Sequence, residues 1–589
     1  MAFNTEKNKL QYDMLVKINT TLPLYLSDRD VVINEILYEG RILNVSDHRE
    51  QINSGFNRKI AFPIVTITLA NSDGYFNDSL NNLDKFWSMV EVEIYTVERG
   101  SVFNEATDLR FKGFIEYSNG IIIKPDTITV KITDFRKKFN KKIPEDVFTK
   151  EEFNNLPEDM VNKPIPILFG DWTVDIPNNT RTAEAFVLDS GNQGGTTPTN
   201  IKCIVGRPGD TGNIGFIGNR VMIKHSGSAY NYSQCEVAFD ISGDTTINLS
   251  EGTFEIDVNS WNRTNDPGTW EGSHNDKVYL FNNKDKFFIQ CQGNTDTTLI
   301  TNPIILIKHI LIEYGGMADE DFDTDSYDIL VDYFSSGENG KVRKQIVKQE
   351  KLWDIIGDLA WEFGVDIYNK NGTVAFLLKE NRQASSSTIA DVIDDDFVQN
   401  KIQLNINPEN IYVTKVTSKY RHDPNANTYT KTYELAADIT KLPMNGLTIK
   451  QERKVEFKWA YEWIAIMNRS VELISSYAKL NKVYTFTLGF KGLNWDVGSL
   501  QAITNSALNL DTVDIYVRSI KKNYIKGTVE IVAYDAYLRD NVGRWTEDYQ
   551  DNWTDSSEAD RIYWGFATDN TGNADPLGTD SQDSTWTVS

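Results

Sequence analysis

Short segments in which apolar and polar residues alternate are the feature that most constrains this chain. In residues 63–71 (PIVTITLAN), Val65, Ile67 and Leu69 share one face while polar residues occupy much of the other. A period of two is typical of a half-buried strand. Turn residues such as Asn119-Gly120 separate such segments. The pattern predicts a mainly antiparallel β protein, with further strands at residues 89–96, 126–135, 511–519 and 527–534.

Three stretches have helical spacing instead, at residues 302–314, 349–363 and 459–480. The first begins with Asn302 and Pro303 and stops at Gly315, which are the expected start and stop signals of a helix. In all three, apolar residues recur on one stripe, which predicts helices that face a core.

The 589 residues suggest about four domains at roughly 150 residues each. We expect a mainly β, multidomain fold with some α structure. The predicted units are a first β-rich unit at 1–145, a β-rich insertion at 146–300, a small α+β domain at 301–400, a β unit with an inserted helix at 401–540, and a C-terminal tail at 541–589. The tail holds ten acidic and two basic residues among interspersed Trp residues. This composition predicts an extended or weakly ordered segment, and the interspersed Trp residues favour docking on a partner over plain disorder.

The net charge of −24 argues against a surface that grips nucleic acid or anionic lipid, because both kinds of binding depend on Lys and Arg. The first ten residues, MAFNTEKNKL, lack the apolar stretch of a signal peptide. The most apolar run, at 303–312, is shorter than the roughly 20 residues that span a bilayer. We therefore expect synthesis in a cytoplasm and no membrane segment.

The ends of the first and fourth units resemble each other. Residues 111–117 (FKGFIEY) and 127–135 (TITVKITDF) form one predicted hairpin, and residues 517–524 and 528–535 form another with similar strand length. Each hairpin closes with an acidic residue beside an aromatic one. The echo predicts two related barrels in one chain. Three such chains would place six similar barrels around an axis and match a six-fold tube while keeping three-fold symmetry.

An ordered series of segments resembles the hub, or minor tail, proteins of long-tailed bacteriophages. It starts with VTITLANSDGYF (residues 65–76), followed by VEVEIY (90–95), FKGFIEY and TITVKITDF. Later segments that resemble the family are KPIPILFGD (163–171), the helix at 307–316, GVDIYNKNGTVAFL (364–377) and YTFTLGFKGLNWDVGS (484–499). Residues 175–300 have no counterpart in this series.

The resemblance implies a structural virion protein of the tail tip or baseplate hub, with two tube-type β-barrel domains. It implies a homotrimeric ring that contacts the tail tube, the tape measure protein, the distal tail protein and a central fibre or spike. Double-stranded DNA would pass through the ring during ejection without sequence-specific binding. An acidic lumen would repel phosphates, although acidity also serves solubility. Two alternatives stay open: a carbohydrate-binding adhesin and a glycan-degrading enzyme.

The sequence predicts no catalytic, cofactor-binding or metal site. Trp361-Glu362 and Trp495-Asp496 are expected to be core Trp residues beside surface acids. The acidic run 319–325 has Thr324 where a calcium loop needs Gly and Leu330 where it needs Glu, so it predicts a helix cap near Ser326. Asp394-Asp395-Asp396 is expected to be a solvated turn.

The remaining candidates also lack the pattern that their chemistry requires. The segment 191–195 (GNQGG) is not followed by the Lys-Ser/Thr of a phosphate loop. Cys203, Cys235 and Cys291 are too scattered for disulfides or zinc and are expected to be structural thiols. His309 is expected to be a packing residue on its helix. The chain is therefore predicted not to be an enzyme.

Overall fold

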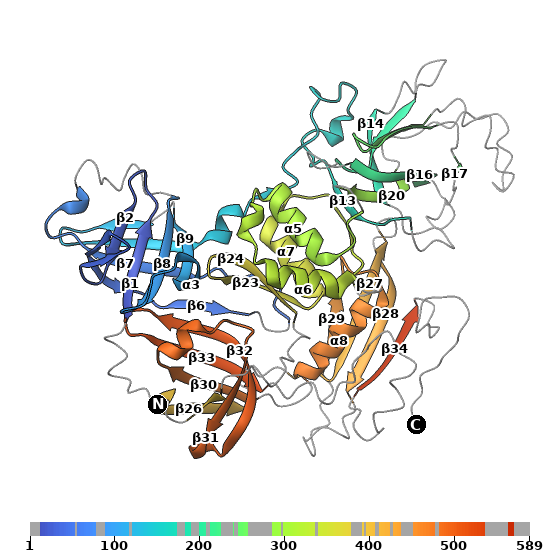
Figure 1. Ribbon diagram of the computed structural model, residues 1–589. Coiled ribbons are helices and arrows are strands. Elements are labelled where there is room, and N and C mark those ends of the chain that lie inside the picture. The colour runs from blue at the N-terminus through green and yellow to red at the C-terminus, as the bar shows by residue number, and fades with distance from the viewer. Residues whose placement is uncertain are drawn as a thin grey trace, which may run out of the picture.

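The computed structural model is mainly β with several separate sheets and few helices, which confirms the predicted fold class. Figure 1 shows the sheets arranged around a central group of helices. The structure describes residues 12–52, 56–77, 89–116, 120–173, 183–189, 200–207, 213–224, 239–240, 245–256, 286–295, 299–335, 340–378, 391–393, 396–406, 412–423, 428–437, 451–477, 482–535 and 563–569.

The N-terminal sheet, sheet 1, has the order β3-β4-β2-β1-β8-β9-β11-β7-β5, with β10 pairing β11. In β7, Val65, Ile67 and Leu69 are buried as their alternation predicts. A short helix, α3 (Glu105–Asp108), precedes β9. The strands are β1 (Tyr12–Ile18), β2 (Leu24–Ser27), β3 (Val31–Ile33), β4 (Ile36–Gly40), β5 (Ile42–Val45), β7 (Ile64–Ala70), β8 (Glu91–Glu98), β9 (Leu109–Ile115), β10 (Ile121–Ile123) and β11 (Thr127–Asp134).

The C-terminal sheet, sheet 2, lies beside sheet 1 and has the order β25-β31-β32-β33-β30-β26. One strand from the N-terminal part of the chain, β6 (His48–Gln51), pairs with β32. A single hydrophobic cluster contains side chains of both sheets, so the two sheets share a core. The strands are β25 (Asp391–Val392), β26 (Phe397–Ile406), β30 (Lys482–Leu488), β31 (Leu500–Asn505), β32 (Leu510–Asn523) and β33 (Thr528–Asp535).

Five strands have the same order and direction in the two sheets. In sheet 1 the path β5-β7-β11-β9-β8 is antiparallel at every step. In sheet 2 the path β26-β30-β33-β32-β31 is likewise antiparallel at every step. The similar hairpins of the sequence, β9–β11 and β32–β33, occupy matching places in these paths. The paths differ beyond the fifth strand, because β1 is antiparallel to β8 whereas β25 is parallel to β31.

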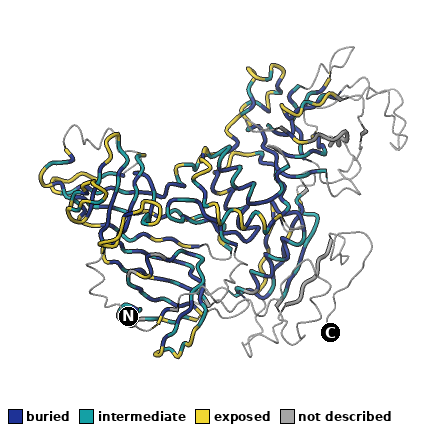
Figure 2. Tube along the Cα trace, viewed as in Figure 1, coloured by how far each residue is buried: buried dark blue, intermediate teal, exposed yellow. Residues whose placement is uncertain are grey.

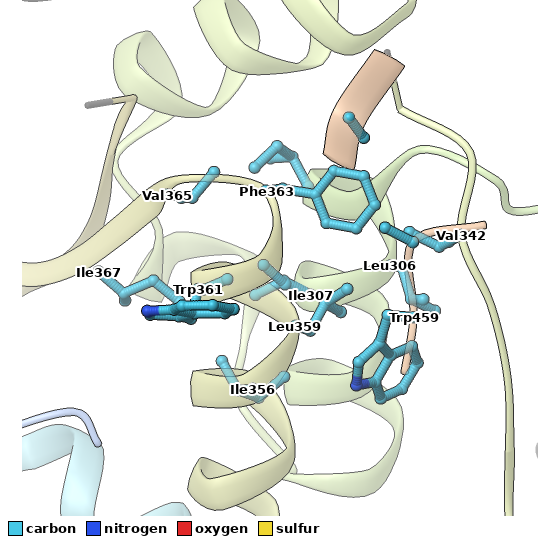
Figure 3. Close-up of a cluster of buried hydrophobic side chains, with 14 of the residues drawn as sticks. Leu306, Ile307, Val342, Ile356, Leu359, Trp361, Phe363, Val365, Ile367 and Trp459 are labelled. Atoms are coloured by element: carbon cyan, nitrogen blue, oxygen red, sulfur yellow. The ribbon is translucent and has the colours of Figure 1, made fainter. Parts of the chain in front are cut away.

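A helical core joins the middle of the chain to a segment inserted between β26 and β30. Figure 3 shows Trp361, Phe363 and Trp459 among the aliphatic side chains of this cluster. It is formed by α5 (Pro303–His309), the π-helical turn Ile310–Tyr314, α6 (Thr324–Ser335), α7 (Leu352–Glu362), the hairpin β23 (Val365–Lys370)–β24 (Thr373–Leu378), α8 (Trp463–Tyr477), β27 (Lys415–Asp423), β28 (Thr428–Ala437) and β29 (Glu452–Glu456). The predicted helices at 302–314, 349–363 and 459–480 all lie here.

Among its described residues, the tail forms the strand β34 (Tyr563–Asp569), which pairs antiparallel with β28. The tail thus meets its own chain along this strand.

The insertion forms a separate sheet in the order β17-β16-β20-β14-β15-β19-β18. Its strands are β14 (Ala183–Asp189), β15 (Ile201–Ile204), β16 (Asn213–Lys224), β17 (Phe239–Asp240), β18 (Thr245–Asn248), β19 (Thr253–Ile256) and β20 (Lys286–Thr295), and two short pairs, β12 (Lys142–Ile143)–β22 (Glu350–Lys351) and β13 (Ile167–Gly170)–β21 (Arg343–Ile346), link the units.

Candidate functional site at the junction of the two sheets

The strand β6 forms the junction between sheets 1 and 2. It follows β5 of sheet 1 by two residues but pairs with β32, with His48 opposite Lys522 and Gln51 opposite Ser519. The alternation of β6 buries His48 and Glu50 and exposes the two residues between and after them. Figure 2 shows both buried and exposed backbone where the two sheets meet. The buried side chains of β6 are the polar ones of His48 and Glu50, at 5% and 7% exposure.

His48 is held by aromatic groups from both sheets. Its Nδ1 lies 2.7 Å from the hydroxyl of Tyr524, which follows β32. Its ring packs against Phe111 of β9, with 4.7 Å between ring centroids. The Tyr524 hydroxyl also donates to the carbonyl oxygen of Arg110, at 3.3 Å. Burial raises the pKa of Tyr524, so this phenol stays protonated and serves as a donor.

Arg136 connects three parts of the molecule and is fully buried. Its Nε and Nη2 each donate to the carboxylate of Asp134 at 2.9 Å, and Nη2 donates to Glu50 Oε1 at 3.2 Å. Nη1 donates to the carbonyl oxygen of Ile367 on β23. Burial alone lowers the pKa of Arg136, but the charges of Asp134 and Glu50 outweigh it and raise the pKa. The guanidinium therefore stays charged inside the junction.

Asn369 on β23 completes this network. Its side-chain amide donates to Asp134 Oδ2 at 2.9 Å, and its backbone N–H donates to Glu50 Oε1 at 3.2 Å. The two carboxylates thus accept hydrogen bonds from sheet 1 and from the helical core together. The exception is Glu50 Oε2, which lies 3.6 Å from His48 Nε2 and has no hydrogen-bond partner among the described residues. The hydrogen-bonded part of the network fixes geometry, because moving any one element would leave a buried charge without its partner in a low dielectric.

A small hollow lies beside the network and is lined by both signs of charge. Lys522 Nζ is 3.7 Å from Asp496 Oδ1, and burial lowers the pKa of Lys522. Burial also lowers the pKa of Arg110. Asp496 faces Lys522 and Glu50 faces Arg136, so the geometry of the hollow supports a rigid joint between the sheets. The lining residues are His48, Glu50, Arg110, Asn369, Asn371, Trp495, Asp496, Val497, Ile520 and Lys522.

Of the residues selected from the sequence, only Trp495 and Asp496 line this hollow. Trp495 is buried, as expected, and Asp496 is partly exposed. For Trp361-Glu362 the expectation of a surface acid was wrong. Glu362 is fully buried and its carboxylate accepts hydrogen bonds from three successive backbone N–H groups, at Lys458, Trp459 and Ala460. These bonds hold the chain in a non-helical turn, so α8 begins at Trp463 rather than near 459.

The acidic run 319–325 caps a helix, as expected. Asp323 Oδ2 accepts the Ser326 N–H at 3.1 Å, and α6 begins at Thr324. Burial by itself raises the pKa of Asp323, but hydrogen bonds from Lys370 and Ser326 outweigh it and lower the pKa. Among the described residues, no group of three or more His, Cys, Asp or Glu side chains could hold a metal ion.

The other selected residues have structural surroundings or lie outside the described residues. Cys203 and Cys291 are buried in the core of the insertion, where burial raises the pKa of both thiols. His309 packs edge-on against Phe169 and Tyr314. Asp396 accepts from Lys491 Nζ at 2.9 Å. Cys235, residues 191–195, Asp394 and Asp395 lie outside the described residues.

Sequence reasoning missed His48, Glu50 and Arg136. The alternation of β6 spans only four residues, HREQ, and all four are polar, so it lacks the apolar stripe that marks a strand. Asp134 is the acidic residue that closes the first of the two similar hairpins. Arg136 follows it by two residues, and this spacing was the signal in the sequence that could have indicated the buried ion pair.

No family model matches the chain, and no curated protein matches it. Solved structures with similar backbones include a tail protein from Neisseria meningitidis MC58 (8% identity, 90% of this chain and 99% of that chain, TM-score 0.39). Others are the 43 kDa tail protein of prophage MuSo2 from Shewanella oneidensis (10%, 89% and 99%, 0.36) and prophage tail protein gp18 from Listeria monocytogenes EGD-e (9%, 89% and 94%, 0.36). At these TM-scores the similarity establishes no family. Across the described part of the chain, no helix is long and apolar enough to cross a membrane.

Proposed function

We propose that this chain is a structural hub at the tip of a phage tail, where three copies form a ring. The observation that carries the proposal is the repeated five-strand path β5-β7-β11-β9-β8 and β26-β30-β33-β32-β31. Two copies of one sheet within a single chain let three chains present six similar sheets around an axis. The ordered segments that resemble tail hub proteins, at 65–135 and 484–535, lie on these same two sheets.

The junction supports this role because it fixes the relation between the two sheets. A ring in which sheets 1 and 2 alternate needs a constant angle between them. The network of Arg136, Asp134 and Glu50 is buried and joins both sheets to the helical core. Sheets 1 and 2 would then continue the wall of the tail tube. The helical core, the insertion and the tail would hold distal partners such as the distal tail protein or a central fibre or spike.

The decisive measurement is particle mass by light scattering, followed by electron microscopy. We expect a species of three times the 67.1 kDa chain mass and a ring whose bore admits a DNA duplex. A monomer, or a compact trimer without a bore, would contradict the hub.

The charge provides a second test. With a net charge of −24, the ring should not retain duplex DNA at low salt, where retention by a basic groove is strongest. Retention of the duplex that weakens steeply with salt would contradict free passage.

A glycan array distinguishes the hub from the alternative of a carbohydrate-binding adhesin, because a hub without a receptor-binding role shows no saturable binding to sugars.

A further inference from the structure

The strand β10 occupies the place in sheet 1 that residues 520–522 of β32 occupy in sheet 2. This correspondence follows from the strands β11 and β33, which hold equivalent places in the two sheets. They align over their whole length, with Thr127 equivalent to Thr528 and Asp134 equivalent to Asp535. Ile122 pairs with Thr129 of β11, and Lys521 pairs with Glu530 of β33, which is the equivalent of Thr129. Ile122 and Lys521 are therefore equivalent positions.

The two places differ in what lies on their outer side. In sheet 2, residues 519–522 are covered by β6, and Lys522 is only 5% exposed. In sheet 1, β11 is the only strand that pairs with β10 among the described residues. Ile122 and Ile123 are 52% and 47% exposed. An uncovered apolar edge strand is a template for pairing with another chain.

The backbone of β10 is oriented to accept a strand. The carbonyl oxygen of Gly120 accepts the Lys131 N–H at 2.7 Å, and the Lys124 N–H donates to Thr127 at 2.8 Å. Hydrogen-bonded and non-bonded positions alternate along an antiparallel pair. The N–H and C=O groups of Ile121 and Ile123 therefore point away from β11, toward the open side.

The equivalent of β6 in sheet 2 is the end of β26. Val45 of β5 lies opposite Ile67, and Ile402 of β26 lies opposite Phe486, which has the same place in β30. Counting four residues onward from each, Arg49 of β6 corresponds to Ile406. The strand β26 ends the path of sheet 2, and Ile406 is 62% exposed. Among the described residues, no strand covers the outer edge of β10 or the outer edge at the end of β26.

We propose that β10 of one copy pairs with the end of β26 of a second copy, which places Ile122 opposite Ile406. The pairing repeats between chains the relation that β6 has to β32 within one chain, where Arg49 lies opposite Lys521. Because β10 and the end of β26 are different surfaces of the chain, each copy binds the next head-to-tail, and three copies close a ring. The inference rests on the ring of the proposed function and names the surface that builds it.

Engineered disulfides test the pairing in the full-length chain. The double variant Ile122→Cys with Ile406→Cys, in a Cys235→Ser background, should form disulfides between copies under mild oxidation, seen as dimers and trimers on non-reducing gels. The matched control joins Ile122→Cys with Ile393→Cys, since Ile393 is 49% exposed but follows β25 at the opposite end of sheet 2. Native mass measurement of the same sample separates the outcomes. A trimer without the Ile122–Ile406 disulfide overturns the pairing and leaves the ring, whereas a monomer overturns both.

A charge exchange tests the same contact without oxidation. Ile122→Lys together with Ile406→Lys places like charges opposite each other and should lower the trimer fraction at least tenfold. Ile122→Lys with Ile406→Glu should restore it. The control Ile329→Lys changes an equally exposed isoleucine on α6 and should leave the mass unchanged. A double-lysine variant that stays trimeric overturns the pairing.

Discussion

Replacing Arg136 tests the claim that the junction locks the two sheets. Arg136→Met keeps much of the side-chain volume but removes the guanidinium, which leaves the carboxylates of Asp134 and Glu50 buried without their cation. Breaking a buried ion pair by removing one partner costs about 3–5 kcal/mol. For a unit of 150–250 residues, each kcal/mol lowers the melting temperature by roughly 2–4 °C. The expected fall for the unit that contains the junction is therefore roughly 6–20 °C.

Differential scanning calorimetry measures this fall, because it resolves the transitions of separate units in a multidomain chain. Arg49→Ala is the matched control, since Arg49 lies on the same strand with its side chain exposed. Surface substitutions of that kind change stability by about 0.5 kcal/mol or less. Arg136→Lys should fall between the two, because lysine keeps the charge but loses the two-pronged contact with Asp134. If Arg136→Met melts within 2 °C of Arg49→Ala, the junction network does not hold the sheets together.

Three further predictions concern other parts of the fold. Because the folded protein lowers the pKa of Asp323, the ionised carboxylate stabilises the fold above its ordinary pKa near 3.9, and this stabilisation is lost as the pH falls through the lowered pKa of the folded state. Asp323→Asn should therefore reduce the change in melting temperature between pH 7 and pH 3. A change in melting temperature equal to that of the unsubstituted protein would contradict this. Truncation after residue 540 removes β34, so the β28 amides should exchange hydrogen faster in mass-spectrometric measurements while the β27 amides stay protected; equal protection of β28 would show that β34 does not cover it. Gly170→Ala places a Cβ 2.0 Å from the carbonyl oxygen of Val342 at a φ of +78° and should lose roughly 1–3 kcal/mol in chemical unfolding, more than Gly316→Ala, which has a similar φ and nothing within 4 Å.

The sequence by itself determined the local structure. The alternation of Val65, Ile67 and Leu69 gave a strand with that face buried, because a period of two places every second side chain on one side. Asn302 caps α5 through the N–H groups of Ile304 and Ile305, as its position before Pro303 indicates. The resemblance between the two hairpins also held at the level of strand order. These features depend on residues that are close to one another in the sequence, so the sequence pattern alone predicts them.

Only the tertiary structure decided where β6 pairs and which acids are buried. Nothing local to HREQ distinguishes pairing with the adjacent β7 from pairing with β32, which begins more than 450 residues later. Glu362 was expected to be a surface acid, and nothing in the sequence singled out Glu50. Burial of a carboxylate depends on donors supplied from elsewhere, here the backbone at 458–460 for Glu362 and Arg136 for Glu50. Likewise, α8 follows β26 in sequence, yet its buried side chains belong to the same hydrophobic cluster as those of α5 and α7. The division of the chain into five units with the boundaries given above stays a prediction. The free-energy cost of burying a carboxylate depends on the groups that hydrogen-bond to it. For Glu50 and Glu362 those groups lie far away in the sequence, so the sequence alone does not show that they are near.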